Sequence, residues 1–363
     1  MTALLAVVWV LHAGVLLVLG TNLVWLARRR RRPLPTALPR VSVLVPARNE
    51  EATLPLLLAS LLRQRGVELE VVVVDDASED GTADVLAAHA DPRLTVVRGE
   101  GPPPGWVGKV HALYQATRHA TGDVFVFLDA DAQLRDDGAL ARLVGRWQDN
   151  GRETALTGLP RYLDRGPAAL LTSLVPFAVL AALPIPLVHR TASPGLSALN
   201  GQVWVLGADA YRRLEPHDAN RAEVLEDVMI GRYLKRAGVR LHFEDLGDDV
   251  AVRMYGSFGE AWRGFRKNAY LLAGGSPVAF AAFFVAYAVS WVVPSVLWLG
   301  GSAGLAALAT LAVIKGVVDR AGRFPLWVSA LGPATLALGA ALQLDSAAAH
   351  ARGRVEWKGR TVS

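Results

Sequence analysis

Hydrophobic positions follow two different patterns along the 363 residues of the chain. The first pattern is long and unbroken, because residues 3–27 carry no formal charge and are mostly apolar. About 20 such residues are enough to span a bilayer. A cleaved signal peptide has a basic start and a short apolar core, and this segment has neither. We therefore expect a retained membrane helix here, near the start of the chain.

Arginines fill positions Arg28 to Arg32, directly after this apolar segment. Basic residues next to a membrane helix mark its cytoplasmic end. The run therefore predicts an outside N-terminus and a cytoplasmic chain from Arg28 onward. The formal net charge of +5 is largely this local excess. We read it as a sign of membrane orientation and expect no nucleic-acid partner.

The second pattern, from about Val41 to Leu246, alternates short apolar runs with helical stretches. This alternation predicts βαβ units and a mostly parallel sheet. Ligands of such sheets bind where the strands end. The expected strands are Val41–Val45, Leu69–Val74, Leu94–Val97, Val124–Leu128 and Val203–Leu206, and the expected helices include Ala52–Gln64 and Thr82–Ala90.

Pro167–Val188 is apolar, but Pro176, Pro184 and Pro186 interrupt it. The pattern favours an interfacial or re-entrant segment over a full span. A buried loop and helix of the soluble domain is the alternative.

Apolar stretches return after Lys267 and predict about three further spans. These are Pro277–Leu299, Ala303–Val318 and Phe324–Leu344. Arg320 and Arg323 make the loop Asp319–Arg323 cytoplasmic by the same rule. Four spans would place the tail outside, although the tail is basic, with Arg352, Arg354, Lys358 and Arg360. Either Ala303–Val318 fails to cross fully or the tail is an exception, and the sequence leaves both open.

Composition narrows the class of protein. Hydrophobic residues make up 52% of the chain and charged residues 20%, which excludes intrinsic disorder and argues against an ordinary soluble enzyme. Cysteine is absent, so there is no disulfide framework, thiolate nucleophile or cysteine-bound metal.

Polar motifs stand at the ends of three expected strands and at a later helix start. They are Pro46-Ala47-Arg48-Asn49-Glu50-Glu51, Asp75 to Thr82, Asp129-Ala130-Asp131 and Glu226-Asp227. Each could be turn or capping chemistry alone. Aspartates two residues apart can, however, both reach one hard cation such as Mg²⁺ or Mn²⁺.

The order and spacing of these motifs resemble the inverting family-2 glycosyltransferases of the GT-A fold, from about Val41 to Asn268. The resemblance implies an α/β, Rossmann-like catalytic domain, here with transmembrane helices at both ends. It implies that Pro46, Arg48 and Glu50 line a nucleotide pocket and that Asp75 or Asp76 bonds the nucleobase. Asp129 and Asp131 would hold the ribose and a divalent cation, Mn²⁺ or Mg²⁺. Asp227, beside Glu226, would be the general base.

Further motifs narrow the resemblance to membrane glycosyltransferases associated with carotenoid and hopanoid pathways. They are Pro104–Lys109, Asn200-Gly201-Gln202, Arg253-Met254-Tyr255, Glu260–Asn268 and Glu356–Arg360. We expect Lys109 on the donor side and Asn200, Gly201, Gln202 and Trp262 on the acceptor side.

The Q-x-x-R-W motif of processive synthases is missing, because the corresponding region reads Gly264-Phe265-Arg266-Lys267-Asn268. This departure favours transfer of one sugar. Arg266 and Lys267 could still neutralise the diphosphate, or they could contact lipid headgroups. His111, His119 and His242 lack the short spacing of metal ligands, and we expect surface or packing roles for them.

We therefore expect an inner-membrane glycosyltransferase. Its parts would be an N-terminal helix with its basic stop (1–32), a cytoplasmic GT-A domain (33–268) with an interfacial segment (167–188), C-terminal helices (269–346) and a basic tail (347–363). It would move a sugar from a nucleotide diphosphosugar, such as a UDP-sugar, to a lipid acceptor entering from the bilayer. The alternatives are a polyprenyl-phosphate sugar transferase and a non-catalytic membrane scaffold.

Overall fold

The computed structural model describes residues 2–28, 37–297, 301–353, 356–357 and 360–361. They form two compact units. The sheet unit comprises Leu26–Arg161 and Pro186–Arg253, and the helical unit comprises Met1–Trp25, Tyr162–Ile185 and Met254–Ser363. Arg29–Arg32, the expected boundary at residue 32, Leu299, Arg354 and Lys358 lie outside the described residues.

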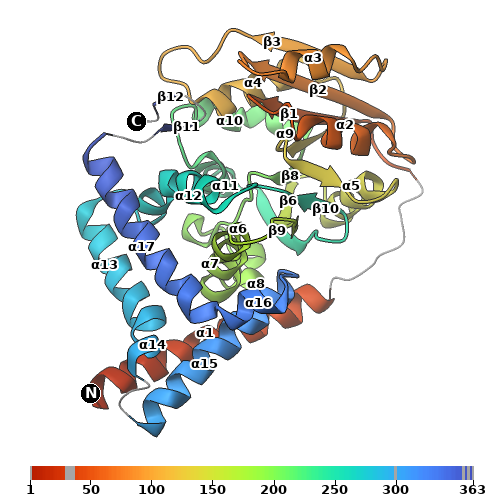
Figure 1. The fold of residues 1–363 in the computed structure, drawn as a ribbon. Coiled ribbons are helices and arrows are strands. Elements are labelled where there is room, and N and C mark those ends of the chain that lie inside the picture. Colours follow the sequence, from red (N-terminus) through yellow and green to blue (C-terminus); the bar gives the residue numbers. More distant parts are fainter. Residues whose placement is uncertain (1, 29–36, 298–300, 354–355, 358–359, 362–363) are drawn as a thin grey trace. The chain divides into compact units, whose positions relative to one another are not determined.

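A sheet of seven strands is the centre of the sheet unit, in the order β3-β2-β1-β4-β8-β6-β9 (Figure 1). The pairs β2–β3, β1–β2, β1–β4 and β6–β9 are parallel, whereas β8 runs antiparallel to β4 and β6. The expected α/β class with a mostly parallel sheet is confirmed. The strands are β1 (Val41–Ala47), β2 (Leu69–Asp76), β3 (Leu94–Gly99), β4 (Val124–Leu128), β6 (Thr154–Leu159), β8 (Val203–Gly207) and β9 (Arg240–Asp245).

Burial explains why these strands form where the apolar runs stand. All five residues of β4 and of β8 are buried, as are nearly all residues of β1 and β2. Strands covered on both faces have continuous hydrophobic runs, which is the pattern that the sequence shows. The helices of this unit are α2 (Leu54–Leu62), α3 (Thr82–Ala87), α4 (Gly108–His119), α5 (Ala139–Asn150), α8 (Ile185–Arg190, from the unit boundary), η1 (Pro194–Leu196), α9 (Ala208–Leu214), α10 (Pro216–Ala219) and α11 (Glu226–Arg236).

A short ladder fixes the chain directly after Asp131. Its strands β5 (Ala132–Leu134) and β10 (Val250–Val252) pair antiparallel, with Ala132 opposite Val252. The Arg253 N–H then donates to the Asp131 carbonyl at 3.1 Å. The remaining strands are β7 (Arg161–Tyr162), β11 (Glu356–Trp357) and β12 (Arg360–Thr361).

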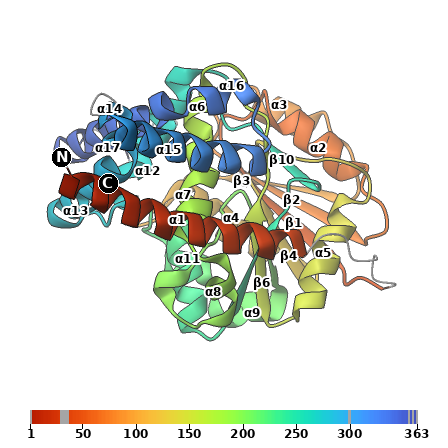
Figure 2. The same cartoon turned by 90° about the horizontal axis from the view of Figure 1, so that it is seen from below.

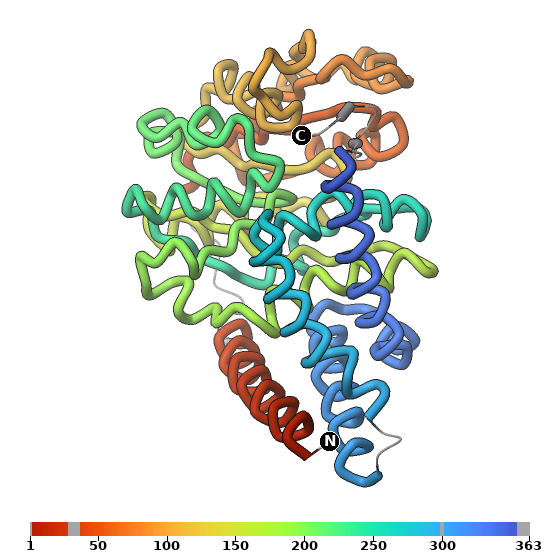
Figure 3. Tube along the Cα trace, turned by 90° about the vertical axis from the view of Figure 1, so that its left-hand side faces the viewer, coloured from red at the N-terminus to blue at the C-terminus, as the bar shows by residue number. Residues whose placement is uncertain are grey.

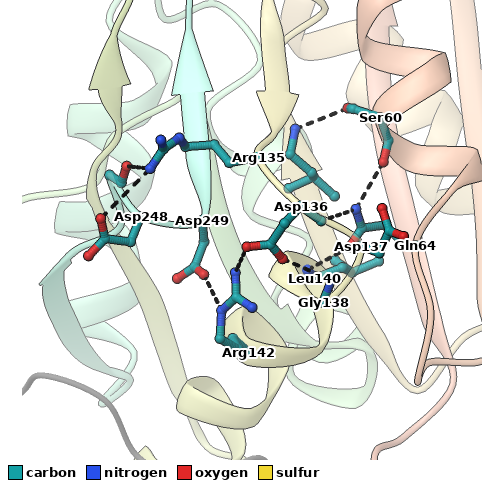
Figure 4. A network of polar contacts seen from close by, with 12 residues as sticks. Ser60, Gln64, Arg135, Asp136, Asp137, Gly138, Leu140, Arg142, Asp248 and Asp249 are labelled. Carbon is teal, nitrogen blue, oxygen red and sulfur yellow. Dashed lines mark hydrogen bonds and ion pairs between the residues drawn. The ribbon is translucent and has the colours of Figure 1, made fainter.

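A charged network holds this ladder in place (Figure 4). The carboxylate of Asp249 is fully buried and pairs with Arg142 at 2.6 Å and with Arg146 at 2.7 Å. Arg142 also pairs with Asp136 at 2.7 Å, just beyond β5. The network therefore ties α5 to both strands of the ladder that follows the Asp129–Asp131 turn.

The helical unit contains the apolar helices. They are α1 (Thr2–Arg28), α6 (Ala168–Thr172), α7 (Leu174–Ala182), α12 (Phe258–Leu272), α13 (Pro277–Tyr287), the π-helix η2 (Ala288–Val292), α14 (Pro294–Leu297), α15 (Ser302–Ala321), α16 (Leu326–Ala330) and α17 (Gly332–Ala351). Among the described residues, three stretches are long and apolar enough to cross a membrane: Thr2–Ala27, Pro277–Leu297 and Ser302–Ala321.

The third C-terminal span expected, Phe324–Leu344, falls on α16 and α17, and neither helix is among those three candidates. Instead, α17 lies beside α12 (Figure 3). The Trp262 indole N–H donates to Asp345 at 2.7 Å, and the Ser346 hydroxyl donates to the Arg266 carbonyl at 2.5 Å. Asp345 and Ser346, two of the few polar residues in the C-terminal half of α17, thus bond it to α12.

Asn22 of α1 bonds to backbone groups of the proline-interrupted segment Pro167–Val188 at the point where α7 ends. Figure 2 shows α1 passing beside α7. Its side-chain amide donates to the carbonyls of Leu180 at 2.9 Å and Leu183 at 2.8 Å, and its oxygen accepts from the Ile185 N–H at 2.8 Å. Asn22 is fully buried. In a bilayer, such backbone groups have no water to bond and need a protein partner.

Candidate functional site

The loops that follow β1 and β2 interlock. Arg48 donates to the carbonyls of Asp76 at 2.8 Å and Ala77 at 2.6 Å. Asn49 and Ala77 both have positive φ, near 54° and 53°. Non-glycine residues adopt this conformation at a cost, and the surrounding structure must hold them there. The sequence motifs around Arg48 and Asp76 therefore form one rigid rim at the strand ends.

Glu50 and Asp75 belong to the same rim. The Glu50 N–H donates to the Thr82 hydroxyl at 2.8 Å, and the Asp75 carboxylate accepts from the Ser78 N–H at 3.1 Å. Pro46 is in β1 and lies opposite Val74 of the neighbouring strand β2. The structure thus brings together the residues expected to line the nucleotide pocket, while their contact with a nucleotide stays a prediction.

The Asp129–Asp131 turn stands at the end of β4, beside the loop that leads into β8. The Asp129 N–H donates to the Gln202 carbonyl at 3.2 Å, and the Ala132 N–H donates to the Asp129 carbonyl at 3.0 Å. Asn200 anchors its own loop, because its side-chain amide donates to the Gly158 carbonyl at 3.0 Å. Two of the expected sites, one for the donor and one for the acceptor, are therefore neighbours.

Lys109 joins the two acidic motifs. Its ammonium nitrogen lies 2.7 Å from Asp129 Oδ1 and 3.1 Å from Glu226 Oε1. It also approaches the Gly201 carbonyl at 3.5 Å. The lysine side chain is 30% exposed and the Asp129 side chain 23%, so this cluster is open to a ligand. Spacing alone gave no sign that residues 109, 129 and 226 would meet.

Asp227 is held against Gly201. The Gly201 N–H donates to Asp227 Oδ2 at 3.1 Å, and the Val228 N–H donates to Oδ1 at 2.8 Å. A Cβ atom at Gly201 would lie 3.2 Å from Asp227 Cβ and 3.3 Å from the Lys109 nitrogen. Glycine at this position lets the backbone approach both side chains closely.

Burial and charge shift the titration of this cluster. Burial, aided by Glu226, raises the pKa of Asp227 to about 6, although Lys109 and the two N–H donors oppose it. Burial alone would lower the pKa of Lys109, but Asp129 and Glu226 outweigh it and raise that pKa. An aspartate with a pKa near neutrality, next to an accessible cation, suits a general base.

His217 is a neighbour of this cluster that belongs to none of the sequence motifs. It is fully buried, and its Nδ1 lies 2.7 Å from the Tyr211 hydroxyl. Burial lowers its pKa to about 3, with Glu226 acting in the opposite direction, so the ring stays neutral. It packs against the rings of Phe127 and Trp204. A lone histidine carries no spacing signal, so only the tertiary structure could reveal it.

Trp262, Arg266 and Lys267 belong to the helical unit, on α12. Trp262 donates to Asp345, and Arg266 lies 3.8 Å from the same carboxylate. These contacts show what holds two of the side chains within their unit. Their expected roles toward acceptor and diphosphate stay predictions.

The residue types at the turn are those that a hard divalent cation prefers, and metal binding here stays a prediction. Asp129 and Asp131 supply carboxylate oxygens, which Mg²⁺ and Mn²⁺ prefer. Among the described residues, no group of three or more metal-ligating side chains occurs. Mg²⁺ is often bound by only one or two carboxylates together with phosphates and water. His242, for which the sequence favours a surface or packing role, lies 2.9 Å from the buried His189.

Comparisons with known proteins find similarity to glycosyltransferases. Residues 42–187 match the sequence model of Glycosyl transferase family 2. A "4,4'-diaponeurosporenoate glycosyltransferase" of Staphylococcus haemolyticus (strain JCSC1435) is 27% identical over 216 residues, covering 59% of this chain and 56% of that protein. The protein of the same description from Staphylococcus aureus (strain MRSA252) is 27% identical over 270 residues, covering 72% of this chain and 66% of its own. The chain thus spans less than two thirds of the length of these relatives.

A solved structure shows the same fold along nearly the whole chain. It is described as a mannosyltransferase from Pyrobaculum calidifontis in complex with GDP-Man and Mn²⁺. Its TM-score is 0.57 at 24% identity, and the match covers 94% of this chain and 99% of that one. The GT-A fold expected from the sequence is therefore confirmed.

Proposed function

We propose that this chain, which carries a family-2 glycosyltransferase domain resembling carotenoid glycosyltransferases, moves one sugar from a nucleotide diphosphosugar to a membrane lipid acceptor. The observation that carries the proposal is the open cluster of Asp129, Lys109, Glu226 and Asp227 at the strand ends. It combines a site for a charged leaving group with a carboxylate suited to take a proton. The description of the staphylococcal relatives supports a carotenoid-type acceptor.

Asp227 is the proposed base, and inversion follows from a single displacement. Its carboxylate takes the proton of the attacking acceptor hydroxyl, whose oxygen bonds to the anomeric carbon as the bond to the diphosphate breaks. The N–H groups of Gly201 and Val228 hold both carboxylate oxygens and so fix the direction of the base. General-base catalysis requires such positioning within hydrogen-bond reach.

The donor end is assigned to the rim and the turn. A divalent cation bound by Asp129 and Asp131 would supply Lewis-acid stabilisation of the leaving diphosphate. The rim around Arg48, Glu50, Asp75 and Asp76 would bind the nucleoside, and we propose a UDP-sugar as donor. The description of the Pyrobaculum protein with GDP-Man and Mn²⁺ supports a nucleotide sugar and a metal in general terms.

The chemical nature of the acceptor group determines how strongly the reaction depends on a general base. A hydroxyl keeps its proton at neutral pH, whereas a carboxyl group has already lost it. Transfer to a carboxylate would therefore depend less on Asp227 than transfer to a hydroxyl. Comparing both acceptor types with the Asp227→Asn variant would separate glycoside formation from glycosyl-ester formation.

Membrane insertion with three spans satisfies the charge rule throughout. α15 has 20 residues and, at 1.5 Å each, reaches about 30 Å, the thickness of the hydrocarbon core. If α1, α13–α14 and α15 cross, then the sheet unit, the loop with Arg320 and Arg323, and the basic tail all face the cytoplasm. This topology removes the conflict over the tail. Reporter fusions after Gly151 and after Ser363 should both be active only in the cytoplasm.

A radiolabelled UDP-sugar mixed with membranes and lipid extract tests the whole proposal. A labelled lipid that carries one sugar by mass spectrometry supports it, and a ladder of many sugars would overturn the single-transfer claim. A product labile to mild acid would indicate the polyprenyl-phosphate alternative. Failure of every donor to react, even by metal-dependent hydrolysis, would favour the non-catalytic scaffold.

A further inference from the structure

Lys109 occupies the place beside Asp129 that a cation would take. Its ammonium lies 2.7 Å from Asp129 Oδ1 and 3.1 Å from Glu226 Oε1, and the Gly201 carbonyl is 3.5 Å away. A lysine ammonium is charged at neutral pH. Through these contacts Lys109 links two acidic motifs that lie about a hundred residues apart in the sequence.

An ammonium and a divalent cation compete for the same oxygen. Mg²⁺ requires a distance of about 2.0–2.1 Å to its oxygen ligands. A cation at that distance from Asp129 Oδ1 would stand within a few ångströms of the lysine nitrogen, and the two positive charges would repel each other strongly. Lys109 can leave this oxygen without losing all its partners, because Glu226 and the Gly201 carbonyl remain within reach.

We propose that Lys109 is a placeholder cation that makes metal binding conditional on the donor. Without a nucleotide, it neutralises Asp129 and disfavours a divalent cation there. When a diphosphate supplies further oxygen ligands, Lys109 yields Asp129 and stays with Glu226. Glu226 then serves as the anchor of Lys109 and not as a second base. The inference rests on the proposed function, since it assumes that Asp129 belongs to a donor-linked metal site.

The test measures Mn²⁺ binding to the purified full-length chain in detergent, by the electron paramagnetic resonance signal of free Mn²⁺, with and without UDP. In the absence of UDP, Lys109→Met should bind Mn²⁺ roughly 10- to 100-fold more tightly than the unaltered protein, as expected from removing a like charge at close range. Lys109→Gln should behave in the same way, and it provides a second variant if the methionine misfolds.

Lys235 offers a matched control. Lys235 is buried, and its ammonium bonds to neutral groups, the carbonyls of Thr191 at 3.1 Å and Leu196 at 2.6 Å. Lys235→Met should leave Mn²⁺ affinity unchanged. Unchanged or weaker UDP-free binding in both Lys109 variants, while UDP promotes Mn²⁺ binding to the unaltered protein, would overturn the placeholder role. Absence of Mn²⁺ binding to the unaltered protein even with UDP would instead refute the metal site of the proposed function.

Discussion

Lys109 in the sheet unit and Lys315 in the helical unit are both lysines placed among acidic groups, but their surroundings differ in charge and in access. Lys109 faces Asp129 and Glu226, whose side chains keep 23% and 13% of their exposure. Among the described residues, Asp319 is the one carboxylate paired with Lys315, and neither side chain has exposed surface. The first cluster has more negative charge than its lysine neutralises, whereas the second is balanced.

The partners of Lys315 complete this contrast. Its ammonium also donates to the Ser173 hydroxyl at 2.9 Å and lies 6.0 Å from the centre of the Phe177 ring. The pair therefore joins α15 to α7 inside the helical unit. An accessible cluster with excess negative charge can bind a ligand, whereas a buried, neutral ion pair stabilises helix packing. Substitutions at Lys109 should therefore alter kinetics, and substitutions at Lys315 should alter stability.

The largest kinetic effect is expected at Asp131. Asp131→Ala removes a proposed metal ligand. The activation barrier for lipid glycosylation should therefore rise by several kcal/mol, which lowers the rate roughly 10³-fold or more. Thermal unfolding should change little. Rates with labelled donor, measured beside melting curves in detergent, check both statements. Full activity of the unaltered protein in excess EDTA would contradict the metal assignment.

Asp227→Asn should lower kcat by roughly 10²–10⁴ with a hydroxyl acceptor, the range for loss of a positioned base. Donor affinity should stay within a few-fold, because the rim and the turn bind the donor. Glu226→Gln serves as the matched control, since Glu226 contacts Lys109 and not the acceptor in this scheme; its loss of kcat should be smaller. Equal, modest losses in the two variants would mean that the base is another residue.

Lys315→Met tests the sealed pair. It leaves the buried Asp319 without its cation, and such a change costs about 3–5 kcal/mol of stability. The double variant Lys315→Met/Asp319→Leu should recover most of that loss, because no uncompensated charge remains. Chemical or thermal unfolding in detergent gives the comparison. A double variant as unstable as the single one would show that the pair is not a balanced structural unit.

Asn22→Leu should destabilise the helical unit by about 1–3 kcal/mol, because two carbonyls and one N–H would lose their buried partner. Thr21→Leu is the neighbouring control, since Thr21 is exposed and its hydroxyl bonds within its own helix to the Val18 carbonyl. Melting temperatures of both variants and the affinity for UDP-sugar should be measured together. A loss of donor affinity with unchanged melting would contradict the structural role of Asn22.

The smallest effect is the pH dependence of kcat. Asp227 must be ionised to accept a proton, and its pKa is about 6. The rate should therefore be level above pH 7 and about tenfold lower at pH 5. Lys109→Met should move this profile to higher pH, because Lys109 opposes the rise in the Asp227 pKa. Lys315→Met should leave the pH profile of kcat unchanged. A shift of the profile in that variant would contradict the assignment of Lys315 to stability alone.

The same pKa has a consequence for stability. An aspartate whose pKa rises on folding binds its proton more tightly in the folded than in the unfolded chain. Its contribution is therefore favourable at low pH and is lost as the pH rises through about 6. This sign is opposite to that of an aspartate stabilised by an ion pair.

Much of the sheet unit could be predicted from the sequence. Continuous apolar runs end at polar motifs, and the starts of β1, β2, β3 and β4 at Val41, Leu69, Leu94 and Val124 coincide with the expected ones. The expected helix start at Glu226 is also confirmed. These features are local. A parallel strand buried on both faces consists of consecutive apolar residues, and polar residues that bind a ligand follow directly after the strand ends.

Contacts between residues far apart in the sequence could not be predicted from the pattern of hydrophobic and polar positions. Only the tertiary structure places Lys109 between Asp129 and Glu226, brings Gly201 against Asp227 and sets His217 near the cluster. The bond from α12 to Asp345 of α17 was likewise not predictable, because Asp345 lies just beyond an apolar stretch that resembles a membrane span. The sequence determined the elements and the chemistry at their ends, since each depends on neighbours along the chain. Which charges meet, and whether they are balanced or left in surplus, was decided by the packing of segments far apart.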